Sequence, residues 1–260
     1  MRLSFVYFGV LDQFFIATIF LFFIVAIVYS SIGHAGASGY LAIMALLSYA
    51  PESIKPTSLV LNITVASIAS FKFISEGYFD RKIFLSLIIF SIPASFLGGY
   101  ITIGTFYFKL IAGIFLIVSA ILLLSKKDMI VDELNEIRSL NIKSAIAGTL
   151  IGFLSGIIGV GGGIFLTPLL LMLKWTSVKK ASGISALFIL CNSIAGLFGH
   201  IISVKQVSYS ILYFIIAVAI GGYIGSFLGT KKFNNRIILY FLFVVLLSAG
   251  IKFIFVDAVK

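Results

Sequence analysis

The stretch SGIIGVGGGIFLTP, residues 155–168, places glycines and a proline in a run that is otherwise apolar enough to be a membrane helix. In the interior of an exposed helix, glycine costs about 1 kcal/mol relative to alanine, and proline costs about 3 kcal/mol. The consecutive glycines Gly161, Gly162 and Gly163 exceed what close helix packing needs. We therefore predict that the helix breaks here and that the break serves a function.

The composition is typical of a protein that crosses a membrane several times. Of the 260 residues, 61% are hydrophobic and only 11% are charged, and the mean hydropathy is +1.20. A soluble domain carries about a quarter charged residues. The acidic residues fall at the edges of apolar runs or between them. These features predict an all-α polytopic membrane protein embedded in the lipid bilayer.

The net charge of +10 does not indicate nucleic-acid binding, because the basic residues come in small groups between apolar segments. Such groups orient membrane proteins against anionic lipid. The glycine-rich GVGGG lacks the Gly-Lys-Ser/Thr that completes a phosphate-binding loop, so ATP-driven transport by this chain alone is excluded. We expect no cofactor, no metal and no enzymatic activity.

A membrane-spanning helix needs about 20 apolar residues, and the chain offers ten apolar segments. Two of the ten, 38–50 and 163–173, are too short to span alone, and each follows a break: GHAGASG (33–39) or GVGGG (159–163). The predicted segments are 13–32, 38–50, 58–75, 83–102, 106–125, 144–158, 163–173, 180–203, 207–230 and 236–256.

The two breaks predict an internal duplication of about five elements per half. A shift of 124 residues aligns similar residues in the same order along both halves: Ser31 with Ser155, Gly39 with Gly163, and Ser58 with Ser182. Such repeats are found by self-similarity at a fixed offset. We predict a first transmembrane repeat at 1–125, a cytoplasmic linker at 126–143 and a second repeat at 144–260.

The basic residues predict the topology. If each short segment turns back as a re-entrant or paired hairpin, the halves insert with opposite orientation, and one side carries twelve basic residues against six on the other. The richer side holds Arg81, Lys82, Lys126, Lys127, Arg138, Lys143, Lys174, Lys179, Lys180, Lys231, Lys232 and Arg236. If each short segment merely completes a crossing, the split is ten against eight. The positive-inside rule favours two inverted repeats in the cell membrane, with the linker cytoplasmic and both termini outside.

Paired helix breaks are the best sequence indication of a transporter's binding site, since irregular backbone at membrane depth has to be buried or line a cavity. Glycines let successive N–H groups converge on an anion, and the following helix contributes the positive end of its dipole. The candidate substrate-binding residues of the second break are Gly159, Gly161, Gly162, Gly163 and Thr167. For Gly148 and Gly152, spaced by four, we favour close helix packing instead.

Other polar residues in the apolar runs are candidates with competing structural roles. For His34 the alternatives are binding of the anion, transfer of a proton, and a hydrogen bond to a loop carbonyl. Asn62 and Asn192 bind substrate or join helices, and the hydroxyl residues bind substrate or cap helices. Lys72 complements an anion or extends its ammonium to the membrane surface. His200 is expected at the interface. The candidates besides the second break are His34, Gly36, Ser38, Thr57, Ser58, Asn62, Lys72, Ser182, Ser185 and Asn192.

The stretch GFLSGIIGVGGGIFLTPLLL (152–171) resembles the G-x-G-G-G-x-x-x-x-P signature of the TauE/SafE sulfite exporter family of membrane transporters. SVKKASGISAL (177–187) and SIKPTSLVLN (53–62) are similar to the family's basic residue followed by small and hydroxyl residues. The first half, GHAGASGYLAIM, has neither a triple glycine nor a proline. The resemblance covers essentially the whole chain and implies transport of small anions, notably sulfite and organosulfonates, without ATP hydrolysis.

We thus expect a secondary transporter of a small anion that works by alternating access. The alternatives are transport of another small organic anion, an intramembrane hydrolase that uses Ser31 and His34, and a membrane scaffold. No acidic residue lies deep in a span, so coupling to H⁺ would rely on His34 or on the substrate. The sequence leaves open Na⁺ coupling, the direction of transport and an oligomer.

Overall fold

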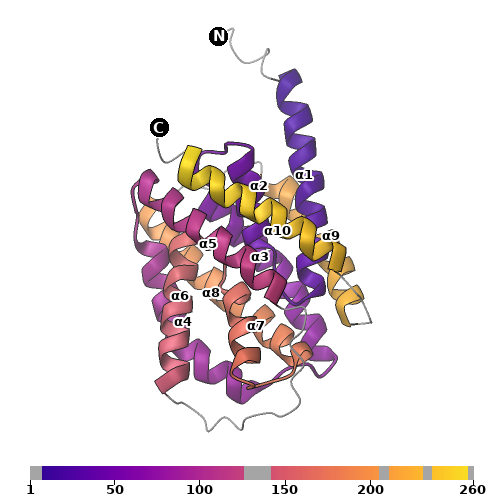
Figure 1. Cartoon of the computed structure of the whole chain (residues 1–260), viewed down its shortest axis with the longest axis vertical. Helices are drawn as coiled ribbons and strands as arrows, with labels where there is room; N and C mark the ends of the chain where they lie inside the picture. Colours follow the sequence, from indigo (N-terminus) through magenta and orange to yellow (C-terminus); the bar gives the residue numbers. More distant parts are fainter. Residues whose placement is uncertain (1–7, 126–141, 205–210, 231–235, 257–260) are drawn as a thin grey trace.

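The computed structural model describes residues 8–125, 142–204, 211–230 and 236–256, which form helices and turns with no strand among them. Five helices precede the linker and five follow it (Figure 1). The first five are α1 (Phe8–Ser31), α2 (Ala37–Leu46), α3 (Pro51–Ser75), α4 (Arg81–Tyr100) and α5 (Thr105–Ser125). The second five are α6 (Ile142–Ile158), α7 (Gly163–Met172), α8 (Val178–Val204), α9 (Ile211–Thr230) and α10 (Arg236–Ile251), which continues as a π-helical turn, Lys252–Val256.

The helices confirm the predicted segments. Six of them are long and apolar enough to cross a membrane, and large apolar side chains such as Phe20, Phe71 and Phe198 are exposed on the outer surface, as contact with lipid requires. The clearest difference is α3, which begins at Pro51 rather than near residue 58. Proline is tolerated at the start of a helix because the N–H it lacks would have no partner there.

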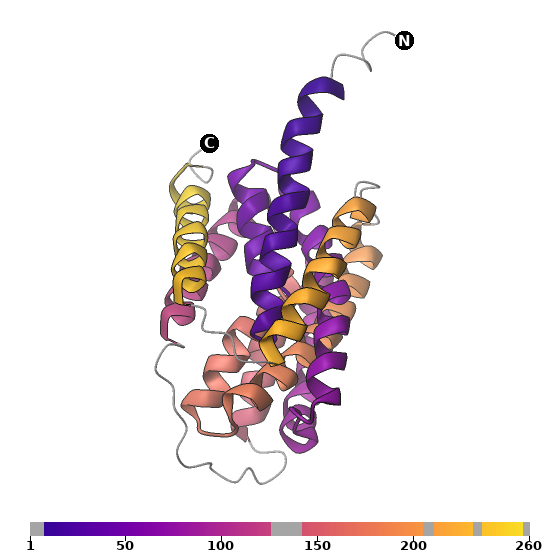
Figure 2. The ribbon, with the colours of Figure 1, turned by 90° about the vertical axis from the view of Figure 1, so that its right-hand side faces the viewer.

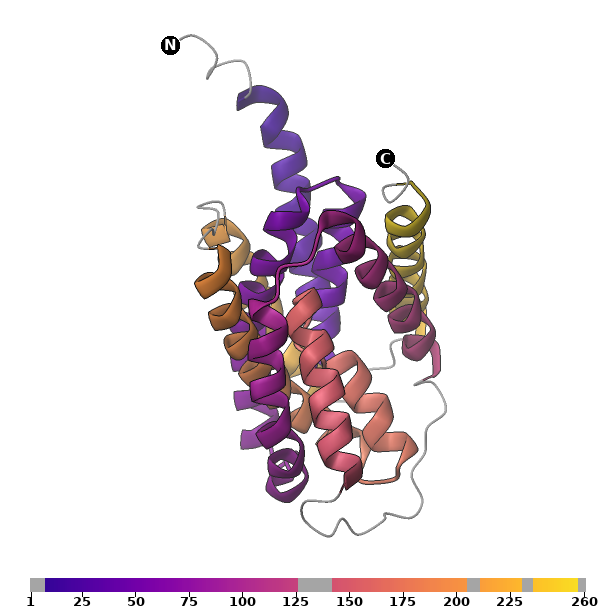
Figure 3. The ribbon, with the colours of Figure 1, turned by 90° about the vertical axis from the view of Figure 1, so that its left-hand side faces the viewer.

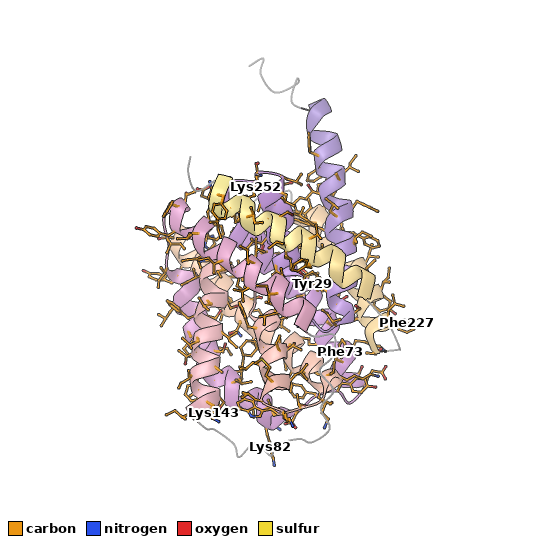
Figure 4. All side chains as sticks on the ribbon, viewed as in Figure 1. Tyr29, Phe73, Lys82, Lys143, Phe227 and Lys252 are labelled. Atoms are coloured by element: carbon orange, nitrogen blue, oxygen red, sulfur yellow. The ribbon has the colours of Figure 1, made fainter. Side chains whose placement is uncertain are left out.

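The direction of the helices agrees with the predicted hairpins. In Figures 1 and 2, α1 and α6 start from opposite ends of the molecule, and each short helix runs in the direction opposite to its predecessor. Lys82 and Lys143 lie at one end, and Lys252 lies at the other (Figure 4). Most of linker 126–143, the extreme termini and several of the counted basic residues lie outside the described residues, so the domain boundaries and the orientation in the membrane stay predictions.

Glycines hold the helices in backbone contact. Every fourth residue of α6 is a glycine that sits on a backbone carbonyl of α4: Gly148 on Leu87, Gly152 on Ser91 and Gly156 on Ser95. These contacts confirm the packing role predicted for Gly148 and Gly152. The same spacing recurs in α9, where Gly221, Gly225 and Gly229 sit on carbonyls of α1 at Phe23, Ile27 and Ser31.

The long helices α3 and α8 pack together across the middle of the molecule, while α5 and α10 lie side by side at one edge (Figure 3). The larger buried core includes residues from α1, α2 and α3 of the first half and from the second break, α8 and α9 of the second. The two breaks therefore lie inside the protein, where irregular backbone is protected from lipid.

Candidate functional site

The predicted break in residues 155–168 is present. Helix α6 ends at Ile158 and α7 begins at Gly163, and between them Gly159, Gly161 and Gly162 have φ values of +88°, +72° and +80°. These left-handed conformations cost an L-residue with a side chain roughly 1–2 kcal/mol each, which explains the glycines. In the first half, Gly33 and Gly36 have φ values of +74° and +98°.

The two breaks have equivalent backbones at an offset of 126 residues. Gly36 and Gly162 both precede ten-residue helices as left-handed N-caps, and Gly33 is equivalent to Gly159. After these helices, Ser48 and Lys174 are the only described non-glycine residues with positive φ, and they too are 126 apart. The offset of 124 used in the sequence comparison is therefore wrong here by two residues. The correct offset aligns IGHAGA (32–37) with IGVGGG (158–163).

Each break packs against the first turns of the other half's long helix. The Cα of Gly33 lies so close to Ser182 of α8 that a Cβ would overlap the serine, and a Cβ on Gly159 would lie 3.0 Å from the backbone oxygen of Lys55 on α3. The hydroxyl of Ser182 also donates to the carbonyl of Ile32 at 2.9 Å. The predicted candidate Ser182 thus supports the first break rather than the second.

A chain of buried hydrogen bonds joins the two breaks. His34 Nε2 lies 2.8 Å from Thr167 Oγ1, and Thr167 Oγ1 lies 2.7 Å from Ser185 Oγ. All three residues were predicted candidates, and all are at most 2% exposed. His34 of the first break is therefore hydrogen-bonded to Thr167, one turn into α7, and Thr167 is in turn hydrogen-bonded to Ser185 of α8.

Polar atoms without partners surround Gly161. A Cβ at this position would meet Ile189 Cγ2 at 2.6 Å, Ser193 Oγ of α8 at 2.9 Å and Asn62 Nδ2 of α3 at 3.1 Å. Both side chains are fully buried, and within the described part of the chain neither the Asn62 amide nor the Ser193 hydroxyl has a hydrogen-bond partner. A buried polar group without a partner costs about 1–3 kcal/mol. This cluster is therefore suited to bind a polar ligand.

The other predicted residues are distributed unequally around this centre. The Asn192 Oδ1 accepts from Ser91, which gives it a structural role between α8 and α4. Thr57 and Ser58 are buried on the first turns of α3. Lys72 lies at the other end of α3, paired with Glu76 at 2.6 Å, so the structure does not bring it to the breaks.

A hollow of about 10 Å³ lies between the two breaks, enough for about one water molecule. Its lining includes His34, Gly36 and Ser38 from the first half and Val160 from the second, and Ser38 donates to the hydroxyl of Tyr29 at 2.9 Å. The predicted cavity shared by the breaks is thus nearly closed in this structure. None of its described lining residues carries the carboxylate that would orient His34 in a hydrolase triad.

Sequence reasoning missed Ser193 and the role of Lys55. Ser193 follows Asn192 in an apolar run, and only the structure shows that it faces Gly161. Lys55 lies in a polar stretch that the sequence placed before α3, but the side chain is buried on the helix and only 7% exposed. The two prolines at 51 and 56 concealed this start of the helix.

Comparison with known proteins identifies relatives along most of the chain. The family model described as "Sulfite exporter TauE/SafE" matches residues 18–253. A probable membrane transporter protein of Sinorhizobium fredii is 36% identical over 181 residues, which cover 68% of this chain and 73% of that protein. Another, of Methanocaldococcus jannaschii, is 30% identical over 157 residues, 58% of either chain. No solved structure gives a significant match.

Proposed function

The chain belongs to the sulfite exporter TauE/SafE family, and on that premise we propose that it is a secondary transporter of a small sulfur-containing anion, such as sulfite or an organosulfonate. Its membership in this family of multi-pass membrane proteins supports transport, and the chemistry around Gly161 supports an oxyanion as cargo. The proposal includes alternating access across the cytoplasmic membrane, with linker 126–143 on the cytoplasmic side.

The observation that carries the proposal is the pair of unsatisfied side chains at Gly161. An oxyanion has several acceptor oxygens, and the Asn62 amide and the Ser193 hydroxyl offer donors on either side of the second break. The start of α7 adds main-chain N–H groups and the positive end of the helix dipole. Together they form a site that holds an anion without a full positive charge, so release requires no ion pair to break.

The surrounding charges favour an anion over a cation. Among the buried side chains that the structure describes, Lys55 is the only charged one, and no carboxylate is among them. A transported cation would need such a carboxylate as a counter-charge at membrane depth. Near the breaks, a small anion meets hydroxyl, amide and imidazole groups and no buried carboxylate among the described residues.

The closed hollow between the breaks supports alternating access. With room for about one water, it cannot pass an oxyanion as it stands, so the elements around His34 and Val160 have to separate on one side at a time. The hydrogen bonds of Thr167 to His34 and Ser185 join the breaks in this closed form. In this proposal, opening exchanges some of these bonds for bonds to the substrate.

Flux into liposomes tests the proposal. Purified protein is reconstituted, and uptake of radiolabelled sulfite and methanesulfonate is compared for the wild type, Gly161→Ala and Gly77→Ala. Both glycines have positive φ, +72° and +78°, but a Cβ at Gly77 meets nothing within 4 Å, whereas one at Gly161 meets Ser193 and Asn62. We expect flux to be lost in Gly161→Ala and kept in Gly77→Ala. Equal flux in both variants, or no flux of either anion in the wild type, would contradict the proposal.

A further inference from the structure

A second cavity, of about 250 Å³, lies beside the second break, near the C-terminal end of α4, whereas Lys82 begins that helix. Its wall includes Glu52 and Lys55 of α3, Thr102 of the connection between α4 and α5, Thr105 of α5, Ile157 of α6, and His200 of α8. This volume accommodates a small oxyanion, in contrast to the hollow between the breaks.

Lys55 gives this cavity a buried positive charge. Its ammonium is held by the carbonyls of Gly98 and Gly99 at 3.3 and 3.0 Å, close to the C-terminal end of α4. The negative end of a helix dipole stabilises a cation there, but carbonyls compensate only part of a full charge. An anion forms the stronger, charge-assisted hydrogen bond with an ammonium group.

His200 points to a ligand independently of Lys55. It is only 5% exposed, lines the same cavity, and within the described residues neither of its ring nitrogens has a hydrogen-bond partner. A buried imidazole without partners loses the hydration that both nitrogens have in water. A ligand with oxygen atoms in the cavity would satisfy at least one of them.

The cavity lies at the edge of the second break. Ile157, in its wall, precedes Gly159 by two residues, and a Cβ on Gly159 would lie within 3.2 Å of the backbone and Cγ of Lys55. An anion bound to Lys55 would therefore be next to the break that holds the proposed central site. The first break has no equivalent buried lysine, because Ser182 lies against Gly33 where Lys55 lies against Gly159, and Lys179 and Lys180 of α8 are exposed.

From this geometry we propose that the cavity is a separate binding site for a small oxyanion, a vestibule in which Lys55 and His200 bind the anion before or after it occupies the central site. The transport role of the vestibule site rests on the proposed function. The binding of anions at this site does not depend on transport. Because the second half supplies no such lysine, the vestibule serves one side of the membrane only. Glu52, at the exposed edge of the wall, repels anions there, so the proposed position of the ligand is the buried end of the cavity at Lys55 and His200.

Calorimetric titration tests binding without transport. Wild-type protein in a zwitterionic detergent is titrated with sodium sulfite and with sodium methanesulfonate, beside Lys55→Met, Lys55→Arg, His200→Phe and Lys252→Met. Lys252 is the matched control, because its ammonium also binds carbonyls at a helix end, those of Ala45 and Leu46, outside this cavity. Loss of a charge-assisted bond predicts a Kd about tenfold higher or more for Lys55→Met.

For the other variants we expect a smaller rise in Kd for His200→Phe, partial recovery in Lys55→Arg, and no change in Lys252→Met. If Lys55→Met binds both anions as tightly as the wild type, the vestibule site is wrong. If Lys55→Met weakens binding only in step with a lower melting temperature, and Lys55→Arg recovers neither, Lys55 is structural and the proposal is likewise overturned.

Sided flux measurements separate the vestibule from the central site. In oriented proteoliposomes, Lys55→Met should raise the half-saturating anion concentration on the vestibule side about tenfold and leave it unchanged on the other side. An equal change on both sides would overturn the vestibule role and leave transport intact. Absence of flux in the wild type, with Lys55-dependent binding retained, would refute the transport function alone.

Anionic lipid provides the remaining comparison. If adding phosphatidylglycerol to zwitterionic nanodiscs abolishes the binding of sulfite and methanesulfonate in the wild type and in Lys252→Met alike, a lipid headgroup occupies the cavity and the proposal is wrong. Unchanged binding of the two anions in both lipid compositions supports a soluble oxyanion as the ligand.

Discussion

Replacing Asn62 with leucine should make the protein more stable and inactive at the same time. Asn62 is fully buried between α3 and the second break, and neither polar atom of its amide has a partner within the described residues. An unsatisfied buried polar group costs about 1–3 kcal/mol, and an apolar side chain of similar size removes that cost. We expect Asn62→Leu to raise the free energy of unfolding by about 2 kcal/mol.

For a chain of this size, 1 kcal/mol changes the melting temperature by about 2–4 °C, so the expected gain is roughly 4–8 °C. The assay is the fluorescence of Trp175, the single tryptophan, which is buried at the end of α7 and reports unfolding in detergent. Flux of sulfite in liposomes is measured on the same preparation and should be lost.

Asn192→Leu is the matched control. Asn192 is equally buried on α8, but its Oδ1 accepts from the Ser91 hydroxyl at 2.8 Å, and the substitution leaves that hydroxyl without this partner. We expect no gain in melting temperature for this variant. A lower melting temperature in Asn62→Leu, or retained flux, would refute the reasoning, because it would mean that Asn62 is satisfied within the resting protein.

Three further predictions follow from the packing and the charges. Gly99→Ala should lower the free energy of unfolding by about 1–3 kcal/mol, since its Cβ would overlap the backbone of Gly196; a stability equal to that of the wild type in the Trp175 assay would contradict this close contact. Lys72→Met should change stability by less than about 1 kcal/mol and leave flux intact, because its pair with Glu76 is exposed; loss of flux would return Lys72 to the substrate site. In a cysteine-free background, Lys82→Cys should react with an impermeant maleimide from the cytoplasmic side and Lys252→Cys from the outside, and labelling of both from one side would contradict the predicted topology.

Hydrophobic length and helix breaks were enough to predict most of the fold. The ten segments and the two glycine breaks follow from local chemistry, because lipid demands uninterrupted apolar helices and only glycine adopts the conformations of Gly159, Gly161 and Gly162 at low cost. The start of α3 was missed since Ile54 and Lys55 lie in a polar, proline-containing stretch that becomes buried only through tertiary contacts, those of Lys55 being with the end of α4 and with Gly159. The offset of the repeat was displaced because single matches between glycines and serines are frequent in a biased composition.

The candidate site was predictable in its backbone but not in its side chains. His34, Thr167 and Ser185 were chosen for their residue types, and their hydrogen bonds depend on how the two halves meet. Ser193 lies against Gly161, more than 30 positions away in the sequence, and Lys55 lies against Gly159, more than 100 positions away. No local sequence pattern identifies either residue. Lys72 was a candidate because it lies within an apolar segment. In the structure it instead pairs with Glu76, one turn away.

The seams in which glycines of α6 lie on α4 and glycines of α9 lie on α1 limit how the protein can move. Each seam joins a helix before linker 126–143 to a helix after it, and no side chain lies between the two backbones at these glycines. If the repeats rocked against each other as two bodies, both seams would have to part and expose main-chain surface. In the proposed alternating access we therefore expect α4 to move together with α6 and α1 to move together with α9.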